Sequence, residues 1–277
     1  MRLLLIKMIK IILLFTSFMV TFLGCSNNDD SSSSKRPDCT SYSTPPFSGT
    51  IFIDPDIITP DDPTAFISLS YQGRAQRTMF DRRVADWITI SPYLFPAVFD
   101  DNTTIEIQVN PEFGTADDAE IQAKKFAPII GRLTTELRKD VETVWIHKGV
   151  QPFGGGNNNL LIHTDYSALH YEDQGILEET FVHEAAHTSL DAYHATNSDW
   201  IKAQEDDCRF ISDYAEDHPT REDIAESYLP YLAVRYRSDR ISIKLKQNIE
   251  SAIPHRIKYF DAQDFNMYPL DNTVDIF

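Results

Sequence analysis

The stretch EETFVHEAAHTSLDAYH, residues 178–194, contains the pattern His-Glu-x-x-His at His183, Glu184 and His187. Apolar residues in and around this stretch recur at helical spacing, which predicts a helix that begins near Ile176. Histidines four residues apart in a helix stand one turn above the other, so both imidazoles can reach a single ion. The pattern is typical of a zinc site whose glutamate activates water. The chain must therefore bring a third ligand to this helix.

One candidate for the third ligand is His194, at the end of the same stretch. Zinc proteases of the metzincin type have a glycine three residues after the second histidine, and this glycine lets the chain turn and bring a third histidine back. Leu190 stands at the glycine position here, and His194 falls one residue too late. We therefore interpret His194 as a surface or supporting histidine, and keep it as the alternative ligand.

A better candidate follows in FISDYAEDHPTREDIAESYLPYLAVRY, residues 210–236. Thr220 followed by Asp223 is a capping-box pattern, which predicts a helix that presents Glu222 and Glu226 on one face. Glu222 can complete the zinc site. Glu226, one turn further along, can accept a hydrogen bond from the far nitrogen of a ligand histidine and fix its tautomer.

These residues resemble those of the gluzincins, zinc metallopeptidases with His-Glu-x-x-His on one helix and a glutamate ligand on a later one. The segment YAEDHPTREDIAESY resembles the second motif of peptidases related to anthrax lethal factor, in which a tyrosine precedes a Glu-x-x-Ala-Glu helix. The resemblance covers residues 160–236 and implies that Glu222 is the third ligand, Glu226 its supporting carboxylate and Tyr214 a donor to the developing oxyanion. The stretch from Tyr214 to Glu222 is one residue longer than in the family motif.

The alternative interpretation is that none of these residues binds a metal. His-Glu-x-x-His arises by chance on the order of once in a hundred chains of this composition. Glu222 and Glu226 would then be a solvated helix face and Tyr214 a rim aromatic, while Glu205 and Glu216 are rival carboxylates.

The first 24 residues resemble a bacterial export signal. A basic start precedes the apolar run IILLFTSFMVTFLG, which is too short to span a bilayer comfortably. The run ends in FLGC, which resembles the lipobox of bacterial lipoproteins and implies a lipid anchor on Cys25 at the bacterial cell envelope, on the outer membrane or cell surface. Residues 25–39 are polar, which predicts a flexible tether. Ordinary signal cleavage and an uncleaved membrane anchor remain alternatives.

The formal net charge of the chain is −17, and the signal contains basic but no acidic residues. Such a chain repels phosphates, so we expect no nucleic-acid partner. Cys39 and Cys208 remain once Cys25 carries lipid, and export permits an intramolecular disulfide between them; two unpaired thiols are the alternative.

Residues 40–277 predict one α+β domain, with an N-terminal part (40–140) and a catalytic part (141–277). Strands are predicted at TIFID (50–54), AFISLSY (65–71), ETVWIHKG (142–149) and NLLIHT (159–164), and one or two helices at 117–140, interrupted near Pro128. The glycine run at 154–156 is predicted to be a flexible hairpin connection between the last two strands.

The resemblance implies a zincin-like metalloprotease fold, a small mixed sheet with the His-Glu-x-x-His helix beside it. It also implies that the edge strand, here NLLIHT, binds substrate backbone by β-augmentation. His163 within this strand lines the cleft or is an ordinary alternating residue.

The sequence thus predicts a zinc metallopeptidase with one Zn²⁺ per chain, Glu184 as general base and a peptide or protein substrate. Two alternatives remain. One is a zinc amide hydrolase that acts on cell-wall linkages, and the other is a non-catalytic surface binding lipoprotein with a relic zinc site.

Overall fold

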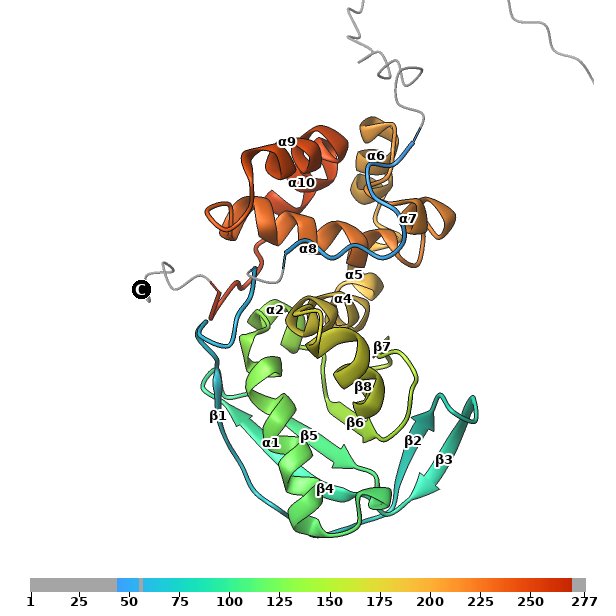
Figure 1. Cartoon of the computed structure of the whole chain (residues 1–277). Helices are drawn as coiled ribbons and strands as arrows, with labels where there is room; N and C mark the ends of the chain where they lie inside the picture. Colours follow the sequence, from blue (N-terminus) through green and yellow to red (C-terminus); the bar gives the residue numbers. More distant parts are fainter. Residues whose placement is uncertain (1–43, 55–56, 271–277) are drawn as a thin grey trace, which may run out of the picture. The chain divides into compact units, whose positions relative to one another are not determined.

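The computed structural model describes residues 44–54 and 57–270, which are drawn in colour in Figure 1. The signal at 1–24, the tether, Cys25 and Cys39 lie outside the described residues, so the lipid anchor and the disulfide stay predictions. Within the described ranges no helix is both long and apolar enough to cross a membrane.

A six-stranded mixed sheet forms the base of the domain, in the order β1-β4-β5-β6-β8-β7. The three strands β5, β6 and β8 run parallel, and the other pairings are antiparallel. The strands are β1 (Phe66–Leu69), β4 (Tyr93–Phe99), β5 (Thr104–Val109), β6 (Thr143–His147), β7 (Gly154–Gly156) and β8 (Asn159–His163). The predicted α+β class with a mixed sheet is confirmed.

Strands β6 and β8 occupy the interior of the sheet, as their apolar sequences require. Parallel strands covered on both faces carry nearly continuous apolar residues, and both strands are buried almost throughout. Leu160 and Ile162 join the main core, whereas Trp145 and Leu161 point to the opposite face.

The predicted hairpin between the strands at 142–149 and 159–164 is wrong, because β6 and β8 are parallel. The glycine run is itself strand β7, which pairs antiparallel with β8 through a tight turn at Asn157 and Asn158. Both asparagines have positive φ, 52° and 56°, a conformation that asparagine tolerates better than most residues and that two-residue hairpins favour. The edge strand is therefore β7, and NLLIHT is an inner strand.

Helices cover one face of the sheet and continue into a second helical layer beyond α4 (Figure 1). Those described are α1 (Ala116–Arg132), α2 (Thr135–Arg138), α3 (Thr164–Tyr166), α4 (Leu177–Ser189), α5 (Asp191–His194), α6 (Ser198–Asp207), α7 (Asp213–Asp217), α8 (Asp223–Tyr236), α9 (Ile243–Ala252) and α10 (Pro254–Asp261), with short helical turns η2 (Pro111–Phe113) and η3 (Ser167–Glu172).

The predicted break near Pro128 is misplaced, because this proline lies inside α1. The chain leaves the helix at Leu133 and Thr134, whose backbones are extended. Thr134 then caps α2, because its side chain accepts the N–H of Leu137. The position of the Thr134 cap, and not that of Pro128, therefore determines where α1 ends and α2 begins.

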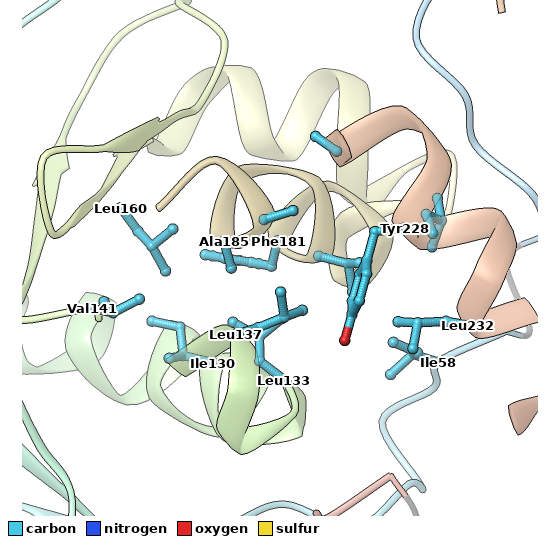
Figure 2. Packing of buried hydrophobic residues seen from close by; sticks show 14 of the residues in the cluster. Ile58, Ile130, Leu133, Leu137, Val141, Leu160, Phe181, Ala185, Tyr228 and Leu232 are labelled. Carbon is cyan, nitrogen blue, oxygen red and sulfur yellow. The ribbon is translucent and has the colours of Figure 1, made fainter. Parts of the chain in front are cut away.

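Helix α4 is packed on several sides at once. Figure 2 shows Phe181 and Ala185 of α4 among Leu137 of α2, Leu160 of β8 and Tyr228 of α8. All five side chains are essentially excluded from water, and burying a large apolar side chain contributes about 1.5–3 kcal/mol. This packing fixes the backbone that carries the two histidines.

A separate hairpin covers part of the other face of the sheet. Strands β2 (Arg77–Asp81) and β3 (Asp86–Ile90) pair antiparallel. Buried Met79 of β2 packs on Trp145 and Leu161 of the sheet, forming a small second core. The hairpin is therefore fixed in place beside β7 and β8.

Candidate metal centre

The two histidines of α4 point their Nε2 atoms at each other. These atoms lie 3.1 Å apart, and the ring planes of His183 and His187 are nearly perpendicular. The arrangement follows from their spacing of four residues on a helix whose neighbouring positions are packed into the core.

Glu222 reaches the same point from a different helix. Its Oε2 atom lies 3.1 Å from Nε2 of His187 and 3.6 Å from Nε2 of His183. All three side chains are largely shielded from solvent, and their potential ligand atoms lie within 4.8 Å of one another. His183, His187 and Glu222 could hold a metal ion, as the two sequence motifs predicted.

The predicted capping box is wrong in its details. Helix α8 begins at Asp223, with Glu222 at the N-cap and no side-chain cap. Asp223 is fully buried and accepts hydrogen bonds from Arg256 and Gln204, so its carboxylate is committed to a tertiary contact. Thr220 is exposed and lies before the helix.

Each histidine has a carboxylate beside its other ring nitrogen. Asp191 Oδ2 lies 2.8 Å from Nδ1 of His187, and Glu226 Oε1 lies 3.5 Å from Nδ1 of His183. The Asp191 contact is a hydrogen bond, which favours a proton on Nδ1 of His187 and leaves its Nε2 lone pair free. The longer Glu226 contact favours the same tautomer of His183 by charge alone. Two lone pairs and the oxygen of Glu222 then face one another, and a cation at their centre satisfies all three.

The charges around the centre favour a cation as well. Burial raises the pKa of Glu222, but hydrogen bonds with His183 and His187 outweigh it and hold the pKa far below its usual range. Burial lowers the pKa of His187, but Asp191 and Glu222 outweigh it and raise the pKa to about 10. Both shifts show how strongly the carboxylates attract positive charge to this point.

A cleft of about 670 Å³, which we call the metal cleft, opens beside the three candidate ligands. Glu184, half-buried on α4, lines it next to the histidines, as expected of a general base. Tyr214 of α7 also lines it, and its hydroxyl donates to Oε1 of Glu222 at 3.1 Å. Glu184 and Tyr214 therefore border one cavity, whereas the third predicted catalytic residue, Glu226, is buried and does not line it.

The rival ligands lie elsewhere. His194 is buried, and its Nδ1 is 2.7 Å from the hydroxyl of Tyr259. Glu205 and Glu216 are exposed and do not belong to the ligand group. His163 is buried in the sheet, where its Nδ1 lies 3.0 Å from the backbone oxygen of Lys148, so the interpretation that it lines the cleft is wrong.

Sequence reasoning missed Asp191 and Arg221. Asp191 follows His187 by four residues, and this spacing on a helical stretch was a usable signal. Arg221 precedes the candidate ligand Glu222, and its Nε donates to Oε1 of Glu222 at 2.8 Å. It therefore holds the carboxylate from the side opposite the histidines.

The predicted strand TIFID lies within residues 47–54, which we call the strap. The TIFID part is not a strand; its N–H groups bind carboxylates of α4 and α8 in place of a neighbouring strand. Ile51 N–H donates to Oε2 of Glu226, and the N–H groups of Ile53 and Asp54 donate to Glu179. Alternate residues Thr50 and Phe52 line the metal cleft.

The chain matches no protein-family model, no curated protein and no solved structure.

Proposed function

We propose that the chain is a zinc-dependent metallopeptidase with a zincin-like fold. The observation that carries the proposal is the convergence of His183, His187 and Glu222 beside Glu184 in one cleft. A structural zinc site has no need of an additional carboxylate at the cavity, whereas a hydrolytic site requires one.

Zinc suits this donor set better than the other common divalent ions. Tetrahedral zinc, with bonds of about 2.0–2.1 Å, separates its ligand atoms by about 3.3 Å. The three separations here are 3.1 Å between the histidine nitrogens, 3.1 Å from His187 to Glu222 and 3.6 Å from His183 to Glu222. Three protein ligands leave a fourth position open, as in catalytic sites.

The proposed reaction is hydrolysis of a peptide bond. Zinc, when bound, would lower the pKa of a water molecule and polarise the scissile carbonyl group. Glu184 takes the proton of the attacking water and delivers it to the leaving amine. Tyr214, whose hydroxyl donates to Oε1 of Glu222 before substrate binds, turns this hydrogen bond to the developing oxyanion. Glu226 and Asp191 keep the two histidines in the tautomer that leaves Nε2 free.

The edge strand that lines the cleft favours an extended substrate. Gly154, Gly155 and Gly156 of β7 line it, and within the described part of the chain only β8 pairs with β7. A peptide can add to this open edge through main-chain hydrogen bonds, which would hold its backbone beside the metal centre. This is the role that the sequence predicted for NLLIHT.

Glu184→Gln tests the proposal directly. The variant should retain about one zinc per chain and lose turnover of casein and of a fluorogenic peptide library by a factor of about 10²–10⁴. Glu178→Gln, on the same helix but outside the cleft, should keep full activity. Full activity in Glu184→Gln would exclude the assignment, and hydrolysis of peptidoglycan without peptides would favour a cell-wall amide hydrolase.

The location remains part of the proposal. We place the enzyme at the bacterial cell envelope, anchored by lipid on Cys25, with a Cys39–Cys208 disulfide. Metabolic labelling with a fatty acid should depend on Cys25. Mass spectrometry of an unreduced digest should find the Cys39 and Cys208 peptides joined.

A further inference from the structure

A second cleft lies on the other face of β7. It measures about 340 Å³, and its walls include Phe80 and Trp87 of the hairpin and Trp145 of β6. This cleft and the metal cleft share all of β7 and one more residue, Arg82. The edge strand therefore has a cavity on each of its faces.

Strand β7 consists of three glycines, so it sends no side chain of its own into either cleft. A side chain at Gly155 would overlap the backbone carbonyl oxygen of Glu184, and one at Gly154 would lie 2.6 Å from the guanidinium of Arg82. Any side chain at this edge must therefore come from another molecule. In an extended peptide paired with β7, successive side chains would enter the two clefts alternately.

The second cleft has the walls of an aromatic pocket. The Trp87 and Trp145 rings lie 5.4 Å apart at 85°, and the Phe80 and Trp87 rings lie 5.6 Å apart at 66°. These are edge-to-face pairs, a geometry that can be extended by another ring. Trp87 is nevertheless 51% exposed, so much of its surface is available to a ligand.

Packing and an ion pair hold the walls of the pocket together. Buried Met79 fixes the hairpin to the sheet, and Arg77 forms a paired ion bridge with Glu106 of β5. Arg82 makes no hydrogen bond or ion pair with any described residue, so its guanidinium is free to lie over the face of a bound ring.

We propose that the second cleft is a specificity pocket for an aromatic side chain of the substrate, next to a residue whose side chain faces the metal centre. This inference rests on the proposed function for the pairing of a peptide with β7. It adds that the preferred substrates carry Phe, Tyr or Trp at one fixed position, and that this aromatic side chain contacts Trp87, Trp145 and Arg82.

The test uses the cleavage sites in a randomised peptide library, followed by a pair of fluorogenic peptides that carry Phe or Ala at the enriched position. The unaltered protein should cleave the Phe peptide with a kcat/KM about threefold to tenfold higher than the Ala peptide. Trp87→Ala should abolish this ratio by slowing cleavage of the Phe peptide alone, and Trp87→Phe should restore part of it. Val84→Ala, an exposed position in the hairpin turn, is the control.

Two outcomes would overturn the pocket while leaving the peptidase proposal intact. They are cleavage without aromatic enrichment at any position, and an equal loss for both peptides in Trp87→Ala. If no peptide is cleaved, the pocket is tested by measuring how tightly fluorescein-labelled Phe and Ala peptides bind to the zinc-loaded protein. Preference for the Phe peptide that depends on Trp87 supports the pocket without the reaction, and equal or absent binding rejects it.

Discussion

The Oδ2 atom of Asp191 lies 2.8 Å from the Nδ1 atom of His187, four residues earlier in the chain. We expect Asp191→Ala to weaken zinc binding by about 10- to 100-fold, because the histidine loses the partner that fixes its tautomer and raises its basicity. Competition with a chromogenic chelator measures the affinity. Asp140→Ala, outside the cleft, is the control, and equal affinities in both variants would contradict the role.

Glu222→Ala should remove or greatly weaken bound zinc, because it deletes one of three ligands. Elemental analysis of the soluble protein from Ser26 to Phe277 gives zinc per chain. Glu216→Ala tests the rival carboxylate and should leave zinc unchanged. If Glu222→Ala retains stoichiometric zinc, the third ligand lies elsewhere.

Gly155→Ala should destabilise the protein by about 1–3 kcal/mol, because its methyl group would overlap the backbone of Glu184, which has little freedom to move. Gly154→Ala is the matched control, because its methyl group is crowded only by the end of the flexible Arg82 side chain and makes an ordinary contact with Leu161. Urea unfolding of both variants measures the difference. Equal stability would mean that β7 is not pressed against α4.

Glu179 should make the free energy of unfolding depend on pH. Burial raises its pKa to about 7, against the opposing effect of the strap N–H groups of Asp54 and Ile53. The folded state therefore holds a proton that the unfolded state releases above the ordinary value of 4.5. This stabilisation is full below pH 4.5 and is lost as the pH rises through 7.

Glu179→Gln does not titrate, so its stability relative to the unaltered protein should rise between pH 5 and 8, by at most about 3 kcal/mol. Urea unfolding at both pH values measures this change. Glu216→Gln, at an exposed position, should show no such trend. A stability difference that is constant with pH would contradict the buried, protonated Glu179.

The local parts of the site could be predicted from the sequence. The spacing of His183 and His187 on an apolar helix is a local property, and so is the helix after Glu222. The predicted cap at Thr220 failed because buried Arg256 takes the carboxylate of Asp223, a partner that no local pattern shows.

The non-local parts could not be predicted. A run of three glycines indicates flexibility, and only the tight packing against α4 shows why Gly155 must be glycine. The strap has the alternating pattern of a strand, but its N–H groups bind side-chain carboxylates from helices. An alternation of apolar and polar residues indicates which side chains are buried, but it does not indicate which groups the backbone binds.

The bond from Ile51 to Glu226 joins residues 175 positions apart in the chain. Contacts of such long sequence separation form slowly, because a large loop must close before they contribute. Glu226 therefore acquires its full set of partners only when both ends of the domain have met. The candidate metal centre is therefore completed late in folding, because one of its supporting carboxylates depends on the first described residues of the domain.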